Sequence, residues 1–295
     1  MQLTDTHIRP GLMQDHLRFL NKIIDDQKPD LIIHTGDAII ESSKDDFLKL
    51  FDFFESKKIP WTLLMGNHEA RALFTLEWLT GELNRRGQDP NSYCKFINLQ
   101  NDDVHGDCNF AINLVDDKGK TVKQVICMDT NRYRDDYYIW DYIRPDQVEW
   151  YERLVKETTS NNNGVPVESG LFIHIPIPEY KEAWDNHEQS EYFEEGGECN
   201  DGVKPAKVNT RIFDKIVELK STKFMTCGHE HANDWCSLYK GVAFCYGVKS
   251  SDNHGDDWSD KAGYLLGDRS FQFTTDHEWN PETDTWRRHY HWKDE

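Results

Sequence analysis

The chain has 295 residues and a formal net charge of −19, from 53 acidic and 34 basic side chains. This length suits one large α/β domain or two small ones, and an aromatic content of 13% argues against general disorder. The apolar runs are too short to span a bilayer, and the acidic excess argues against a nucleic-acid-binding surface or binding to anionic membranes. An enzyme that acts on phosphate is not excluded, because a bound metal can reverse the local electric field.

Helices and short buried strands alternate in the first part of the sequence. The spacing of apolar residues predicts helices over about 13–27 and 47–54, and short apolar runs predict strands at 31–35 and 61–65. A further helix, rich in Ala, Leu and Glu, is expected after Glu69. This alternation is typical of an α/β sheet.

Strands become more frequent after residue 93. The expected elements are a strand pair (110–114 and 122–128) around a turn at 116–119, a helix from 144 to about 160, a strand at 170–174, an acidic loop at 185–202, a helix near 209–220 and a strand at 223–227. We expect the acidic loop to be a solvated excursion. Because no repeat or Pro/Ser-rich linker interrupts the chain, we predict a single domain over residues 1–295 in which strands of both halves form two sheets.

Two of the seven cysteines occupy positions that suit a disulfide. Lys240-Gly241 fits a two-residue hairpin turn that pairs Tyr239 with Val242. This pairing would set Cys236 opposite Cys245, with the Cβ atoms close enough for a bond. The alternative, which we favour, is two buried thiols that act as small apolar groups. The sequence has no Cys-x-x-Cys pair, so a zinc ribbon has no support.

Five segments place Asp, Asn or His directly after an apolar run that is typical of a strand. They are Asp5-Thr6-His7, Gly36-Asp37, Gly66-Asn67-His68-Glu69, His174 and Gly228-His229-Glu230-His231. Since ligands bind α/β sheets at the carboxyl ends of strands, we expect the five segments to converge on one rim. Carboxylate, amide and imidazole groups together suit two hard or borderline metal ions. Each segment alone would indicate an ordinary turn or a buried histidine, and only the ordered set predicts a metal site.

The ordered set resembles the motif series of the calcineurin-like metallophosphoesterase superfamily, over residues 3 to about 250. Residues 172–180 and 229–236 are similar to the purple-acid-phosphatase-like branch of fungi and plants. True purple acid phosphatases carry a tyrosine metal ligand shortly after the Gly-Asp motif, but Gly36-Asp37 is followed by Ala38-Ile39-Ile40-Glu41, and His7 is present as in the non-purple members. The resemblance therefore implies a four-layer αββα sandwich of two mixed sheets flanked by helices, without a purple iron–tyrosinate centre.

The resemblance also implies a role for each matched residue. The implied metal ligands are Asp5, His7 and His231 for a first ion, Asn67, His174 and His229 for a second, and Asp37 as the bridge between them. Asn67 and His68 would bind the substrate phosphate, and Asp37 and His68 would be the catalytic residues. Two ions about 3.5–4 Å apart can share the hydroxide that attacks phosphorus. His68, if protonated, would stabilise the transition state or protonate the leaving oxygen. These ligand types accept Mn, Fe, Zn or Mg, so the identity of the two divalent or trivalent ions stays open.

Three further positions near the motifs have more than one interpretation. Glu69 either orients His68 or is a helix-start carboxylate favoured by the helix dipole. The segment 129–131 ends a strand and either reaches the rim or, as we favour, forms a turn. Glu230 lies between two expected ligands and should point away from them, because strand residues alternate in direction.

Loop residues near the expected rim are harder to assign. Tyr180, Trp184 and His187 either line a substrate pocket or pack within their own loop, and His254 is expected in a polar loop near the rim. Substrate range would depend on the loops at 131–144, 178–205 and 250–262.

The beginning of the sequence leads to a separate expectation. Only four residues precede Asp5, which is short for the first central strand of a sheet. No cationic stretch followed by an apolar run is present after Met1. We expect the natural N-terminus to be missing, and the cell compartment stays open.

The predicted function is metal-dependent hydrolysis of phosphomonoesters, with phosphoproteins among the candidate substrates. The nearest alternative is a phosphodiesterase or nucleotide hydrolase with the same metal site. The alternative of another class is a non-catalytic metal-binding scaffold, which the intact ligands and His68 argue against.

Overall fold

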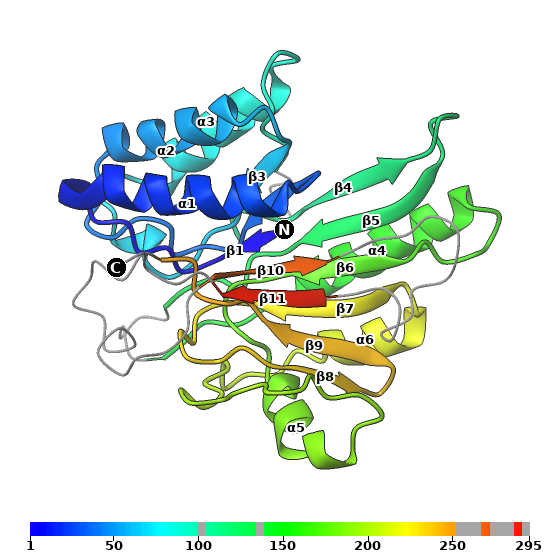
Figure 1. Ribbon diagram of the computed structural model, residues 1–295. Coiled ribbons are helices and arrows are strands. Elements are labelled where there is room, and N and C mark those ends of the chain that lie inside the picture. The colour runs from blue at the N-terminus through cyan, green and yellow to red at the C-terminus, as the bar shows by residue number, and fades with distance from the viewer. Residues whose placement is uncertain (99–103, 134–138, 252–266, 272–285, 291–295) are drawn as a thin grey trace.

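Two mixed β-sheets flanked by helices form the core of the computed structural model, which describes residues 1–98, 104–133, 139–251, 267–271 and 286–290 (Figure 1). The sheets pack against each other through a shared apolar core, to which the first sheet contributes Leu3 and Leu63 and the second contributes Phe172 and Ala243. The predicted layer arrangement of the α/β fold is confirmed.

The first sheet has the strand order β11-β10-β1-β2-β3. Its strands are β1 (Gln2–Leu3), β2 (Ile32–His34), β3 (Trp61–Leu63), β10 (Gly267–Phe271) and β11 (Trp286–Tyr290). The first three are parallel, with Gln2 opposite Ile33, and β10 joins β1 in the antiparallel direction with Arg269 opposite Gln2. The N-terminal strand therefore lies in the interior of the sheet.

Three helices pack on this sheet: α1 (Met13–Gln27), α2 (Lys44–Ser56) and α3 (Leu76–Gln88) (Figure 1). The sequence specifies α2 locally, because Ser43 and Asp46 form a capping box at its start. Short 3-10 turns at Pro10–Leu12 and Glu69–Arg71 precede α1 and follow the Asn67-His68 segment.

The second sheet has the strand order β4-β5-β6-β7-β9-β8. Its strands are β4 (Phe110–Val115), β5 (Thr121–Cys127), β6 (Ser169–Phe172), β7 (Thr222–Cys227), β8 (Cys236–Tyr239) and β9 (Val242–Tyr246). The helices α4 (Pro145–Asn161), α5 (Glu179–Asp185) and α6 (Ile212–Leu219) belong to the same half, with a 3-10 turn at His187–Gln189. Successive residues of β6 face opposite cores: Leu171 packs with the helices, and Phe172 faces the first sheet.

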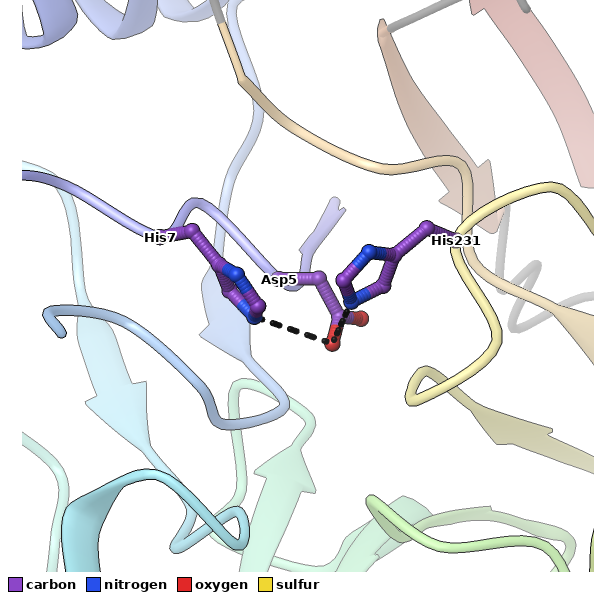
Figure 2. Close-up of side chains that lie close together, drawn as sticks. All are labelled: Asp5, His7 and His231. Atoms are coloured by element: carbon purple, nitrogen blue, oxygen red, sulfur yellow. Dashed lines mark ion pairs between the residues drawn. The ribbon is translucent and has the colours of Figure 1, made fainter. Parts of the chain in front are cut away.

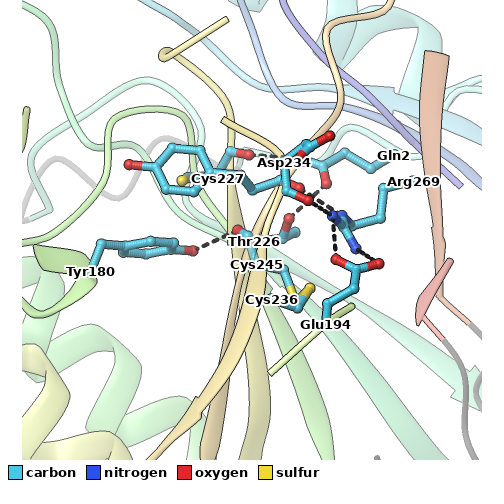
Figure 3. Close-up of a disulfide and its surroundings, with 10 residues drawn as sticks. Gln2, Tyr180, Glu194, Thr226, Cys227, Asp234, Cys236, Cys245 and Arg269 are labelled. Atoms are coloured by element: carbon cyan, nitrogen blue, oxygen red, sulfur yellow. Dashed lines mark hydrogen bonds and ion pairs between the residues drawn. A yellow bond between two sulfur atoms is a disulfide. The ribbon is translucent and has the colours of Figure 1, made fainter. Parts of the chain in front are cut away.

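The hairpin β8–β9 corrects one prediction and confirms another. Tyr239 pairs with Val242 and Cys236 with Cys245, as the sequence predicted. The two cysteines form a disulfide, so the preference for free thiols was wrong (Figure 3). Cross-strand pairing places the two Cα atoms 4.1 Å apart, so the two sulfur atoms can meet and form the disulfide.

The acidic segment 185–202 is not a solvated excursion throughout. Phe193 pairs with Ser237 of β8, and the amide of Glu194 donates to the carbonyl of Cys236 at 2.9 Å. The Glu194 carboxylate accepts from buried Arg269 of β10 at 3.0 Å (Figure 3). Backbone pairing and a buried cation therefore bind this acidic segment to the sheet.

Backbone hydrogen bonds join the carboxyl ends of neighbouring strands within each sheet. The amide of Asp5 donates to the carbonyl of Gly36 after β2, and the amide of Gly228 donates to the carbonyl of His174 after β6.

None of the described helices combines the length and apolarity that a bilayer crossing needs. The return of β10 to β1 agrees with the single domain over 1–295, which stays a prediction.

Candidate metal centre

The structure brings the five sequence segments together at the strand ends. Asp5 and His7 follow β1, Asp37 follows β2, Asn67 and His68 follow β3, His174 follows β6, and His229 and His231 follow β7. The amide of His229 donates to Asp5 Oδ2 at 3.0 Å, which joins the loop after β7 to the loop after β1. The backbone therefore brings the five segments to one rim, as expected.

One cluster consists of Asp5, His7 and His231, whose ligand atoms lie within 4.8 Å of one another. Figure 2 shows the two imidazoles on opposite sides of the Asp5 carboxylate. Asp5 Oδ1 is 4.0 Å from His7 Nε2 and 3.5 Å from His231 Nε2. These are the three side chains expected around a first metal ion.

A second cluster consists of Asp37, His174 and His229. His174 is buried, and its Nε2 lies 3.3 Å from Asp37 Oδ2 and 3.2 Å from Asn67 Oδ1. Its Nδ1 lies 2.8 Å from the carbonyl of Thr35, which fixes Nδ1 as the protonated nitrogen and leaves Nε2 to face the cluster.

Asp37 connects the two clusters. Its Oδ2 lies 3.5 Å from His7 Nε2 of the first cluster and 3.3 Å from His174 Nε2 of the second. Its Oδ1 accepts the backbone amide of His68 at 2.7 Å, so the carboxylate has a fixed orientation. This position suits the bridging role that the family resemblance implies.

Four of the seven expected ligands have a left-handed backbone conformation. The φ values are 50° at Asp5, 46° at His7, 54° at Asp37 and 76° at His229. Non-glycine residues adopt this region at a cost of about 1–3 kcal/mol each, and such residues cluster at functional sites. The strain turns each side chain toward the rim instead of continuing the strand.

Two glycines permit close approach of the loops. A Cβ at Gly228 would lie 2.0 Å from Thr4 Oγ1 and 2.4 Å from Asp5 Oδ2, and one at Gly66 would lie 2.3 Å from Asp37 Oδ1. Any side chain at either position would push a cluster carboxylate out of place.

Glu69 holds the backbone around the clusters. Its buried carboxylate accepts the amides of Asp37 at 2.9 Å, Ala38 at 2.8 Å and Gly66 at 2.7 Å. Burial, followed by the charge of Asp37, raises the pKa of Glu69 to about 7. The carboxylate thus ties the loop after β2 to the loop after β3, a role that neither sequence interpretation contained.

The surroundings favour the metal-binding protonation state at some of the expected ligands but not at all of them. Burial alone would lower the pKa of His174, but the charge of Asp37 raises it to about 10. At His7 and His229 burial dominates. It lowers the pKa of His7 and of His229 to about 3, so both imidazoles are neutral near pH 7. Burial alone would raise the pKa values of Asp5 and Asp37, but the neighbouring histidines lower both. Neutral imidazoles and ionised carboxylates are the forms that coordinate a metal.

His68 lies beside the clusters with its side chain 26% exposed, twice as much as that of His7 at 13%. Its ring centroid is 4.7 Å from that of His7, and its Nε2 is 3.9 Å from Asp37 Oδ2. Burial lowers the pKa of His68. The side chain that should meet the substrate therefore lies on the more exposed side of the centre.

Four residues near the centre were not found from the sequence. The Tyr133 hydroxyl accepts from Asn67 Nδ2 at 3.2 Å, and the Trp140 ring lies 4.4 Å from the His229 ring. Arg71 stacks over Tyr133 at 4.8 Å, and the Lys249 ammonium lies 3.4 Å from His231 Nδ1. Tyr133 follows the end of β5 and could have been found by the strand-end rule, but loop positions such as Lys249 carry no such signal.

The polar segment 129–131 is irregular backbone without an assigned turn, and Thr130 Oγ1 accepts the amide of Ile175, directly after His174, at 3.0 Å. Asp129 accepts the amide of Asp107, and Asn131 Nδ2 donates to the carbonyl of Tyr142. Glu230, expected to point away from the ligands, accepts from the Tyr246 hydroxyl and the amide of Lys204.

The residues after His174 pack against one another and against the second sheet. Tyr180 is buried and donates to the carbonyl of Cys245, and Trp184 stacks on His187 at 4.4 Å. The packed-loop interpretation therefore holds over the substrate-pocket one. His254 lies outside the described residues.

Two buried atoms without a hydrogen-bond partner indicate that the first cluster fits a metal ion. Asp5 Oδ1 and His7 Nε2 are buried and make no hydrogen bond with the described residues. An unsatisfied buried carboxylate oxygen costs free energy unless a cation or donor faces it. Both atoms point into the first cluster, so the residues present fit the group that the family implies.

The family profile described as calcineurin-like phosphoesterase matches residues 1–233, more than three quarters of the sequence. The chain belongs to the calcineurin-like phosphoesterase family. It is 28% identical to "Probable inactive purple acid phosphatase 29" of Arabidopsis thaliana, over 78% of this chain and 61% of that protein. It is also 28% identical to "Phosphatase DCR2" of Saccharomyces cerevisiae, over 78% of this chain and 41% of that protein. The recognition of a purple-acid-phosphatase-like member of this family is confirmed.

The fold of this phosphoesterase is similar to a solved structure, a dimetal phosphatase from Danio rerio. The TM-score is 0.55 at 10% identity, and the similarity covers 84% of this chain and 86% of that one, which shows a common fold. The chain spans about three fifths or less of the length of the curated relatives named above.

Proposed function

We propose that this phosphoesterase is a phosphatase that hydrolyses phosphomonoesters at a dinuclear metal centre. The observation that supports this most is the pair of clusters around Asp37, with His68 on the exposed side. One relative is named a phosphatase and another a probable inactive enzyme, so activity itself is part of the proposal. The complete donor set and His68 favour an active enzyme over a non-catalytic scaffold.

Each residue of the centre would have a defined role in binding metal or substrate. Asp5, His7 and His231 would hold one ion, Asn67, His174 and His229 the other, and Asp37 both. When bound, two metal ions supply Lewis-acid activation of the phosphate and of a water molecule. Asn67 and His68 would bind the phosphate oxygens. In its protonated form, His68 would deliver a proton to the leaving oxygen as the ester P–O bond breaks and water oxygen is added to phosphorus.

The rim next to His68 suits a peptide-borne phosphate. Leu73 is 78% exposed, and Arg71 has no carboxylate partner among the described residues. An apolar side chain and a guanidinium that no described carboxylate pairs with, both next to the phosphate site, offer contacts to a phosphoprotein that a small ester does not need.

The central test compares para-nitrophenyl phosphate with bis(para-nitrophenyl) phosphate on protein loaded with Mn²⁺. We expect faster hydrolysis of the monoester, and faster hydrolysis of the diester would favour a phosphodiesterase or nucleotide hydrolase. In the same assay His68→Ala should lower kcat by at least about 100-fold while both metals stay bound. Undiminished turnover would remove His68 from the mechanism, and an inactive wild-type protein with two bound metals would indicate a scaffold.

A further inference from the structure

Both expected metal sites depend on Asp37, so the groups that fix this residue affect the whole centre. Its Oδ2 lies 3.5 Å from His7 Nε2 and 3.3 Å from His174 Nε2, one residue from each cluster. Its backbone has a φ of 54°, a region that a non-glycine residue keeps only when its surroundings hold it there. The contacts of the Asp37 backbone are therefore part of the centre.

The carboxylate of Glu69 faces this strained turn. Its Oε2 accepts the amide of Asp37 at 2.9 Å, and its Oε1 accepts the next amide, that of Ala38, at 2.8 Å. Successive backbone amides that converge in this way form an anion-binding concavity, which a side chain of the same chain occupies here. An ionised carboxylate only accepts hydrogen bonds, so these contacts fix the direction in which both amides point.

One oxygen of the same carboxylate also holds the loop after β3. Glu69 Oε2 accepts the amide of Gly66 at 2.7 Å in addition to that of Asp37. The two loops are in close contact, because a Cβ at Gly66 would lie 2.5 Å from the Asp37 nitrogen. This oxygen thus joins the turn after β2 to the segment that carries Asn67 and His68.

Asp37 and the turn at 68–69 hold each other reciprocally. The amide of His68 donates to Asp37 Oδ1 at 2.7 Å, while the amide of Asp37 donates to the side chain of Glu69. Two consecutive residues therefore fix both the carboxylate and the backbone of Asp37. Glu69 is fully buried and is not a member of the three clusters of possible ligand atoms found among the described residues. Its contacts with the centre are made through backbone amides.

We propose that Glu69 is a positioning residue that holds Asp37 in the bridging position and so sets the affinity of both metal sites and the coupling between the two ions. The inference rests on the proposed dinuclear centre but not on the identity of the substrate. The role differs from orienting the His68 ring and from stabilising a helix start, because it acts through three backbone amides.

The first test removes one acceptor from Glu69 without changing its size. Glu69→Gln has a single acceptor oxygen, so its NH₂ group must face at least one of the three amides. The Mn²⁺ titration is done at pH 8, above the value of about 7 to which burial raises the pKa of Glu69. Both sites should be weakened about 10- to 100-fold, the usual range for a group that orients a ligand. Electron paramagnetic resonance of the saturated variant should show a weaker exchange coupling between the two ions than in wild type.

The matched control is Glu55→Gln. Glu55 also accepts three hydrogen bonds, from Ser92, Tyr93 and Trp61, and none of these residues is an expected ligand. This variant should lose stability while both Mn²⁺ affinities stay at their wild-type values. Equal losses of affinity in the two variants would overturn the inference, because they would reflect general destabilisation.

Amide hydrogen exchange in the metal-free protein tests the contacts themselves. In Glu69→Gln the amides of Asp37, Ala38 and Gly66 should exchange faster than in wild type, and Glu55→Gln should leave them unchanged. Faster exchange with wild-type affinity at both sites would show that Glu69 only supports the fold and would overturn the inference, as would a loss confined to one site. Wild-type protein that binds no Mn²⁺ would instead refute the proposed centre.

Discussion

The backbone around the clusters is strained, and each strained residue is held by a hydrogen bond to a neighbouring strand end. The amide of Asp5 donates to the carbonyl of Gly36, and that of His7 donates to the carbonyl of Asp37, each at 3.1 Å. These bonds compensate for part of the cost of positive φ. The ligands are therefore arranged by the strand ends before any cation arrives.

Gly228→Ala should damage the centre through packing alone. The added methyl group would overlap Thr4 Oγ1 and Asp5 Oδ2, which lie 2.0 and 2.4 Å from the Cβ position. We expect a loss of about 1–3 kcal/mol in the free energy of unfolding and weaker binding at the first metal site. Thermal unfolding and Mn²⁺ titration measure both effects.

Gly81→Ala is the control for this change. No atom lies within 4 Å of its Cβ position, and the residue is inside α3, so the protein should gain up to about 1 kcal/mol. Metal affinity in Gly228→Ala equal to that of wild type would contradict the packing argument.

Arg71→Ala should raise KM more than it lowers kcat. The exposed guanidinium lies on the turn directly after His68 and can contact an anionic substrate, but it is not a metal ligand. A loss of about 1 kcal/mol corresponds to a KM about 5-fold higher, the scale of an ion pair near the surface. Steady-state kinetics on para-nitrophenyl phosphate and on a phosphopeptide measure the change, with Arg85→Ala on α3 as the control. Unchanged KM for both substrates would exclude Arg71 from substrate binding.

The motif residues could be predicted from the sequence, but the groups that hold them could not. Asp5, Asn67 and His174 follow runs typical of strands, and the ordered set of five such segments predicts their position at one rim. The hydrogen bond from Asn67 to Tyr133 spans 66 residues, and only the folded chain brings the two together. A residue whose function depends on a tertiary contact cannot be recognised from the spacing of residue types in the sequence.

At the scale of elements, dependence on distant contacts also explains two predictions that were wrong, namely free thiols at Cys236 and Cys245 and a solvated acidic loop at 185–202. The hairpin register that pairs Cys236 with Cys245 follows from a two-residue turn, which is local. Whether the thiols are oxidised, and whether an acidic segment packs on β8, depends on partners elsewhere in the chain. Arg269, which holds Glu194, enters the structure from β10, 75 residues later.

Arg269 should be a main support of the second sheet's edge. It is fully buried and donates to the Glu194 carboxylate and to the carbonyls of Tyr246 and Asp234 (Figure 3). Arg269→Met should lower the free energy of unfolding by about 3–5 kcal/mol, because it leaves a buried carboxylate without its cation. Urea unfolding measures the loss.

Arg85→Met provides the comparison for Arg269→Met, since Arg85 pairs with Glu82 on the helix surface and should cost less than about 1 kcal/mol. Adding Glu194→Gln to Arg269→Met should recover part of the stability. If Arg269→Met and Arg85→Met cost the same, the buried pair is not a support.

Glu55 makes the junction of α2 and β3 sensitive to acid. Burial alone would raise its pKa, but hydrogen bonds from Ser92, Tyr93 and Trp61 lower it below the ordinary 4.5. A lowered pKa contributes stability above the unfolded pKa, and this contribution is lost as the pH falls through the folded value. The stability difference between wild type and Glu55→Gln should therefore be largest at pH 6–7 and shrink below about pH 4.5. Denaturant unfolding across this range measures it, and a difference independent of pH would refute the assignment.

At the scale of the whole molecule, the net charge of −19 opposes the approach of anionic substrates, while the proposed centre attracts them locally. The long-range repulsion is screened over about 10 Å at 0.1 M salt. We therefore expect kcat/KM for an anionic phosphopeptide to rise modestly between about 10 and 150 mM NaCl. Kinetics in a single buffer test this, and a steep fall would show that local attraction dominates the encounter.

The central position of β1 also has a consequence for how the chain folds. Gln2 pairs with Ile33 on one side and with Arg269 on the other, so the strand before Asp5 is complete only when residues separated by most of the sequence have met. Contacts of such long range slow folding, because chain entropy is lost before they form. During synthesis on a ribosome, β1 would emerge before β10 and would lack this pairing partner until β10 is made. Refolding should therefore restore helical signal before it restores metal binding.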